Sequence, residues 1–142
     1  MDIDRPMLAP ATDGTRAVRT AAAMYVVLGL GFGSGTAVTL WHFDRHGELP
    51  MTPFGFRSLA GGPFEELDPA KFGALGWSLV AVSALDVLTG IWLWRGRRSG
   101  LRLGLVSALP SLGLGVGFAL PILLVGVPVR MALAIIGRRA LR

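Results

Sequence analysis

Three long apolar blocks, each with arginines next to at least one end, constrain this chain more than any other feature. They cover residues 20–41, 73–94 and 101–137. Each exceeds the length of about 18 apolar residues that a helix needs to cross the hydrocarbon core of a bilayer. A hydrophobic fraction of 52% with only 16% charged residues also fits a membrane protein better than a soluble domain. The sequence therefore predicts an all-α integral membrane protein.

The third block is too long for a single crossing, which takes about 20 residues. Arginines bound it on both sides, so both of its ends are expected on the same side of the membrane. We predict a helical hairpin with its turn near 115–117, among three alternating glycines, and with Pro121 in the first turn of the last helix. A turn at 126–128 is the alternative, and it leaves a last helix too short for a usual span.

The predicted organisation is a single membrane domain over residues 16–142, preceded by a cytoplasmic lead-in at 1–15. Its four helices are expected at about 17–41, 73–95, 101–115 and 118–138. The first apolar run is longer than the core of a signal peptide, which is about 7–15 residues, so we expect this helix to be retained. The outer loop at 42–72 is rich in proline, glycine and phenylalanine. We expect it to lie on its own bundle at the membrane interface, and a partner-binding surface is the alternative.

The distribution of cations predicts the orientation of the helices. Cytoplasmic loops of membrane proteins carry an excess of arginine and lysine. Of the 14 cations, ten lie in segments that the topology places on one side: Arg5, Arg16, Arg19, Arg95, Arg97, Arg98, Arg102, Arg138, Arg139 and Arg142. We therefore expect both termini in the cytoplasm. Arginine, alanine and glycine are abundant, as is typical of high-GC bacterial genomes, so we expect a bacterial plasma (inner) membrane.

Small residues recur at intervals of three or four along the predicted helices. Membrane helices associate where small residues let their backbones approach. Such stripes include Gly29 and Gly33 in the first helix, Gly104 and Ser107 in the third, and Gly126 in the fourth. The spacing predicts close contact, either within the bundle or with other subunits.

Asp86 is the most informative polar residue, because it interrupts an apolar helix. A charge in the hydrocarbon core costs about 2.5–3.5 kcal/mol on insertion scales, and intramembrane acids often have a function. Ser83, Asp86 and Gly90 share one helical face, which we expect to point inward. Arg130 lies at a similar depth if the turn is near 115–117. We therefore predict a structural ion pair between Asp86 and Arg130, with a proton or cation relay and a contact to another subunit as alternatives.

His42, Asp44 and His46 form an HxDxH pattern at the outer end of the first helix. Two histidines and a carboxylate are ligands of zinc, copper and non-haem iron. Because Gly47 and Pro50 indicate that the helix ends here, and because interfacial histidines are usually solvated, we expect no bound metal. The apolar blocks contain no histidine, which disfavours haem, and we expect no cofactor.

No catalytic or nucleotide-binding signature is present. The net charge of +5 is concentrated at the ends of apolar blocks, which does not fit a nucleic-acid groove. We expect a small non-catalytic membrane protein that contacts the lipid bilayer and serves as an accessory or structural subunit, beside other membrane subunits or copies of itself. The alternative is an oligomeric transporter or channel with Asp86 as an ion or proton site. A third hypothesis, a lipid-modifying enzyme using His42, Asp44 and His46, requires a bound metal.

Overall fold

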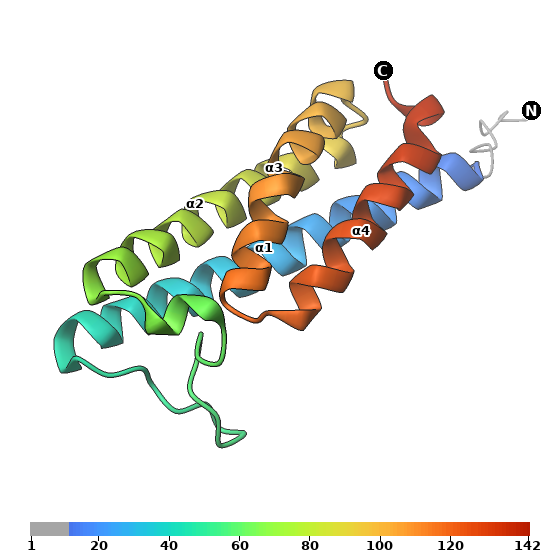
Figure 1. Cartoon of the computed structure of the whole chain (residues 1–142). Coiled ribbons are helices and arrows are strands. Elements are labelled where there is room, and N and C mark those ends of the chain that lie inside the picture. The colour runs from blue at the N-terminus through green and yellow to red at the C-terminus, as the bar shows by residue number, and fades with distance from the viewer. Residues whose placement is uncertain (1–11) are drawn as a thin grey trace, which may run out of the picture.

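The computed structural model describes residues 12–142, and this part of the chain is all-α (Figure 1). It contains four α-helices and two short 3₁₀ helices, which are α1 (Asp13–His46), η1 (Pro63–Glu66), α2 (Pro69–Trp94), α3 (Arg98–Gly117), α4 (Pro121–Ile136) and η2 (Gly137–Ala140). Within these residues there is no β-strand, and one isolated bridge joins Met51 to Arg57. Four helical segments are long and apolar enough to cross a membrane, with α4 and η2 counted as one segment of 20 residues. The fold is that of a multi-pass membrane protein.

Local signals set the ends of α1 beyond the expected span of 17–41. The Thr12 hydroxyl accepts a hydrogen bond from the Thr15 N–H at 3.4 Å, which caps the first turn. Gly47 ends the helix with a φ of +72°, a left-handed conformation that favours glycine. The helix therefore continues through the predicted start of the outer loop to His46. The predicted lead-in at 1–15 lies mostly outside the described residues.

The turn between α3 and α4 lies at 118–120, slightly later than the predicted 115–117. Residues 115–117 remain helical, and Pro121 is the first residue of α4. Proline is tolerated there because the first backbone N–H groups of a helix have no partner within the helix. Gly117 lies against the ring of Phe64, so its missing side chain makes room for the outer loop and does not form the turn. The alternative turn at 126–128 falls inside α4.

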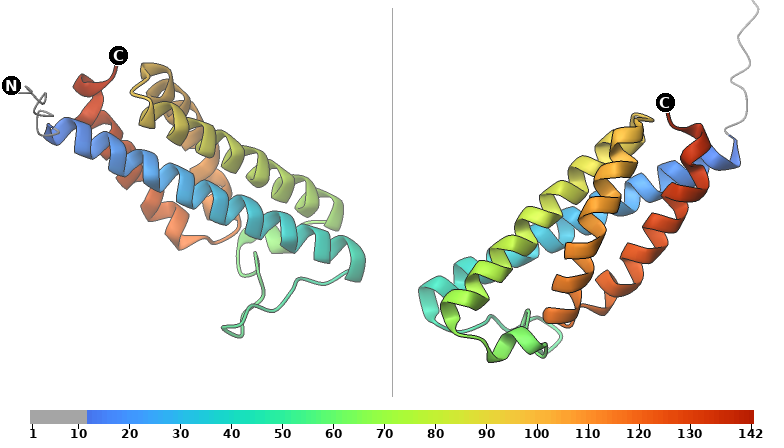
Figure 2. Two further views of the ribbon diagram at one scale, coloured as in Figure 1. Left: turned by 180° about the vertical axis from the view of Figure 1, so that it is seen from behind. Right: turned by 45° about the horizontal axis from the view of Figure 1, so that its top comes forward.

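The four helices form a bundle in which each packs on two neighbours. α1 packs on α2, α2 on α3, α3 on α4, and α4 on α1. α2 and α4 consequently lie across one diagonal of the bundle, and α1 and α3 across the other. The start of α1, the α2–α3 turn and the C-terminus lie at one end, and the outer loop and the α3–α4 turn at the other (Figures 1 and 2).

Both ends of the outer loop pack on the bundle, through Leu49, Leu59 and Phe64, and its tip stands away. Phe64 and Phe72 lie edge-on to Phe118, with ring centroids 5.1 and 5.5 Å apart, and close the outer end of the core. Phe54 and Phe56 lie at the loop tip and are 85% and 60% exposed. The two ends of the loop are therefore part of the core, whereas the side chains at its tip are exposed.

Candidate functional site

Asp86 lies on the buried face of α2. Ser83, Asp86 and Gly90 are all buried, as their spacing in the sequence predicts, and Asp86 is 4% exposed. Gly90 allows α1 to approach, because a Cβ there would lie 2.8 Å from the Ala22 carbonyl oxygen. Close packing of α1 and α2 thus excludes lipid and water from the carboxylate.

Arg130 reaches Asp86 across the centre of the bundle. Its Nη2 lies 2.6 Å from Asp86 Oδ2, and its side chain is 1% exposed. Because α2 and α4 lie on a diagonal, this ion pair links two helices that do not otherwise pack on each other closely. A buried carboxylate and guanidinium in direct contact offset part of each other's desolvation cost.

The other two helices complete the cluster. Ser107 on α3 donates a hydrogen bond to Asp86 Oδ1 at 3.0 Å. Tyr25 on α1 lies under the guanidinium, with the Arg130 Cζ 4.2 Å from its ring centroid. Such a cation–π contact contributes about 2 kcal/mol when it is desolvated. Each helix therefore supplies one side chain to a single buried polar cluster, which we call the central cluster: Tyr25, Asp86, Ser107 and Arg130.

Tyr25 and the double role of Ser107 were not expected from the sequence. Ser107 and Gly104 were assigned to a helix-packing stripe, and that stripe faces Tyr25: a Cβ on Gly104 would lie 2.6 Å from the Tyr25 hydroxyl oxygen. Tyr25 is the single tyrosine of the chain, and it stands within an apolar run. A single tyrosine inside an apolar helix was the one sequence feature that could have indicated a buried polar contact at this position.

The remaining glycines of the packing stripes contact two different helices. Gly29 and Gly33 face α2, where their Cβ positions lie 2.8 Å from the Ser83 carbonyl oxygen and 3.1 Å from Ser83 Cβ. Gly126 faces α1, with Leu28 2.9 Å from its Cβ position. These three positions therefore hold α1 against both of its neighbours in the bundle.

The histidine pattern at the outer end of α1 does not converge. His42 and His46 stack with ring centroids 4.2 Å apart, and His46 Nδ1 lies 3.1 Å from the His42 carbonyl oxygen. Asp44 is two residues from each histidine, and so about 200° around the helix from both. Across residues 12–142 no three histidine or acidic side chains are grouped in a way that would bind a metal ion.

The central cluster is closed to ligands. Both carboxylate oxygens of Asp86 accept hydrogen bonds from this chain, and neither charged side chain is open to solvent. Two nearby polar atoms, Arg130 Nε and Ser111 Oγ, have no hydrogen-bond partner among the described residues. The geometry is suited to holding four helices in register.

Comparison with protein-family models, curated proteins and solved structures finds no match for this chain.

Proposed function

We propose that this chain is a non-catalytic integral membrane protein that serves as an accessory or structural subunit of a larger membrane complex. The observation that carries the proposal is the outward face of α1. Gly31 and Gly35 lie on this face with no atom within 4 Å of their Cβ positions, between the exposed side chains of Val27 and Val38. Small residues four apart let another membrane helix approach closely.

The inner face of α1 already uses the same arrangement. Gly29 and Gly33 are also four residues apart, and they bring α1 into close contact with α2. The outward face presents a second pair of this kind, and Gly31 and Gly35 line a groove of about 190 Å³ that the outer loop also borders through Phe56 and Leu59. A partner helix that packs there would bury Gly31 and Gly35 as α2 buries the inner pair.

The central cluster supports a structural role. Asp86 and Arg130 are engaged with each other and with residues from the other two helices. We infer that this cluster fixes the arrangement of the four helices, because α1 joins the Asp86–Arg130 pair through the ring of Tyr25.

The interaction is tested by capture from native membranes in mild detergent, with the tagged chain at native expression. We expect the unmodified chain to recover a defined set of membrane subunits, and Gly31→Leu with Gly35→Leu to lose it. Gly113→Leu is the matched control, because Gly113 on α3 also has no atom within 4 Å of its Cβ position. Recovery of a lone monomer would contradict the proposal. Recovery of copies of this chain alone would show that it forms a homo-oligomer and is not a subunit of a larger complex.

We further propose that the arginine-rich end of the bundle faces the cytoplasm of a bacterial cell, with both termini inside. Arg16, Arg97 and Arg142 lie at that end, whereas acidic Glu65 and Glu66 lie in the outer loop. The chain has no cysteine, so single cysteines report the topology directly. A membrane-impermeant maleimide is expected to label Glu66→Cys in intact cells and to label Ser99→Cys only after lysis. The reverse pattern would refute the orientation.

A second candidate, an oligomeric transporter or channel that uses Asp86, is favoured by one observation. Ser111 lies one turn beyond Ser107 on α3, is fully buried, and has no partner for its hydroxyl among residues 12–142. Buried hydroxyls near an intramembrane acid are typical of proton paths. Asp86→Asn keeps a similar side-chain shape, and unchanged proton flux in reconstituted vesicles would remove Asp86 from such a mechanism.

A further inference from the structure

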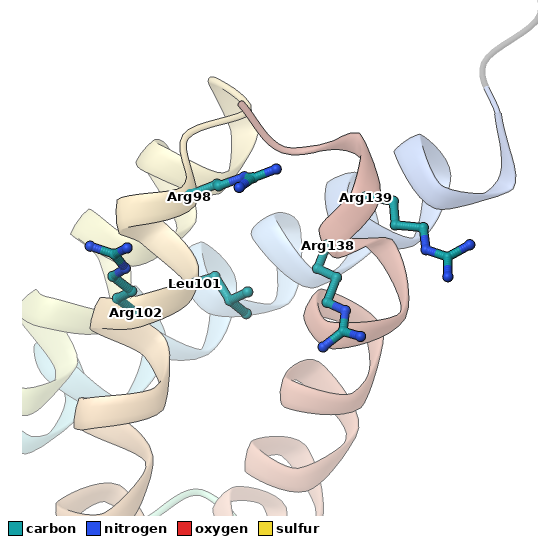
Figure 3. A pocket seen from close by; sticks show the side chains of 5 residues that line it. All are labelled: Arg98, Leu101, Arg102, Arg138 and Arg139. Atoms are coloured by element: carbon teal, nitrogen blue, oxygen red, sulfur yellow. The ribbon is translucent and has the colours of Figure 1, made fainter.

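Arginines surround a pocket between the start of α3 and the end of α4, at the arginine-rich end of the bundle. The pocket has a volume of about 310 Å³ and is lined by Arg98, Leu101, Arg102, Arg138 and Arg139. In Figure 3, Leu101 points into the space between the two helices, and Arg138 extends along the facing side of α4. The guanidinium groups of Arg102 and Arg139 lie at the outer sides. The pocket thus combines an apolar floor with a cationic rim.

The C-terminal segment holds one side of this pocket in place. The Arg142 N–H donates to the Gly96 carbonyl oxygen at 2.7 Å, and the Arg98 N–H donates to the Arg142 carbonyl oxygen at 3.0 Å. Arg98 Nε also donates to the Leu141 carbonyl oxygen at 3.3 Å, and the Leu141 side chain is buried. These bonds tie the chain after α4 to the α2–α3 turn, so the pocket is built from fixed elements.

The four rim arginines carry uncompensated charge. Within residues 12–142 the one ion pair is that of Asp86 with Arg130, so none of the four contacts a carboxylate of this region. Like charges gathered at one end of the bundle repel each other, and an anion bound between them reduces that repulsion. Guanidinium groups bind phosphate oxygens through paired hydrogen bonds, which makes a phosphate group the best-matched anion.

The pocket also lies where the surface changes from cationic to apolar. On α3, Arg98 and Arg102 are followed by Val106 and Leu109, which are 74% and 80% exposed. On α4, exposed Ile136 precedes the two arginines of the pocket. A ligand with its phosphate at the rim can therefore lay hydrocarbon along both helices, which a free phosphate cannot do.

We propose that this pocket binds the phosphate of an anionic phospholipid, whose acyl chains lie along the exposed apolar side chains of α3 and α4. Basic pockets between membrane helices at a membrane surface are suited to anionic headgroups. The site would act as a specific lipid contact in addition to the general attraction of the arginines to an anionic membrane. It does not depend on the subunit role proposed above.

The test is native mass spectrometry of the full chain in detergent, titrated with phosphatidylglycerol or phosphatidylcholine. Each guanidinium that hydrogen-bonds the phosphate in the pocket contributes at least about tenfold in affinity, so Arg102→Gln with Arg138→Gln is expected to weaken phosphatidylglycerol binding by about 100-fold. Arg95→Gln with Arg97→Gln is the matched control, since it removes the same charge from the same end outside the pocket. The control is expected to keep the preference for phosphatidylglycerol over phosphatidylcholine.

Three outcomes would overturn the proposal. The first is equal loss of binding in the pocket and control variants, which would indicate general electrostatic attraction. The second is displacement of the lipid by millimolar inorganic phosphate, which would indicate a free-anion site. The third is unchanged binding in the pocket variant. Because a folding defect would also abolish binding, Arg102→Lys with Arg138→Lys serves as a second variant, which keeps the charge and is expected to bind more weakly than the unmodified chain.

Discussion

Replacing Arg130 with methionine removes the guanidinium from the centre of the bundle and leaves the Asp86 carboxylate without its charged partner. The mirror change, Asp86→Leu, leaves the guanidinium buried on the ring of Tyr25. Methionine and leucine are apolar and flexible enough to occupy much of the same space. The double variant carries neither charge, so the three proteins form a double-mutant cycle for the ion pair.

The structure sets the expected magnitudes. Removing one partner from a buried ion pair costs about 3–5 kcal/mol of unfolding free energy, because the other charge remains buried and uncompensated. Removing both partners is often close to neutral, so we expect the double variant to lie within about 2 kcal/mol of the unmodified chain. Single hydrogen bonds between membrane helices contribute only about 0.6 kcal/mol on average. The coupling free energy between Asp86 and Arg130 is therefore expected to be about 4 kcal/mol or more, and a value of this size would come from the attraction between the two charges.

The assay is reversible unfolding in mixed micelles by increasing SDS, followed by far-UV circular dichroism. Arg138→Met is the control for loss of an arginine, because Arg138 is exposed at the rim of the bundle and its replacement is expected to change stability by about 0.5 kcal/mol or less. If the double variant loses as much stability as the two single variants together, Asp86 and Arg130 act independently, and the reasoning from a buried ion pair is wrong.

Three further predictions use the same unfolding assay. Gly29→Ala is expected to lower the free energy of unfolding by about 1–3 kcal/mol, because the new Cβ meets backbone atoms of α2. Gly31→Ala is expected to raise it by up to about 1 kcal/mol, because Gly31 faces open space. Similar effects at both positions would contradict the assigned faces. Gly47→Ala is expected to cost about 1 kcal/mol through its left-handed φ, and no loss would argue against this helix end. Tyr25→Leu is expected to cost about 2 kcal/mol through the lost cation–π contact with Arg130, in addition to the lost packing of a buried ring, and only the cation–π part should disappear in the Arg130→Met background.

The number of long apolar helices could be predicted from sequence, because the length of each apolar block sets how many membrane-spanning helices it can form. The contact between Asp86 and Arg130 followed from their similar depth once the last block was divided into two helices. The exact turn could not be predicted. Gly115 and Gly117 suggested a flexible connection, but Gly117 is there to accommodate Phe64, a contact between segments distant in sequence.

Tyr25 and Ser107 show why the rest of the cluster was missed. In each of their helices, the spacing of apolar residues predicts which face is buried. It does not predict which neighbouring helix covers that face. The order of helices around the bundle places α1 and α3 on either side of the ion pair, and this order depends on packing along all four helices. Gly29 and Gly31 point to nearly opposite sides of α1, because they are two residues apart on the helix, but spacing alone could not predict which of them faces α2.

The diagonal ion pair also has a consequence for how the protein is made. Arg130 lies 44 residues after Asp86, and ribosomes add about 5–20 residues per second, so α2 is synthesised seconds before its partner exists. During that interval the acid raises the cost of inserting α2 by about 2.5–3.5 kcal/mol. A chain that stops at Gly117 keeps this cost, and in a pulse-chase experiment it is expected to be degraded faster than the same truncation carrying Asp86→Leu. On this reasoning, the last helix is expected to complete the insertion of the second, and the unpaired acid is expected to make unfinished chains a target for degradation.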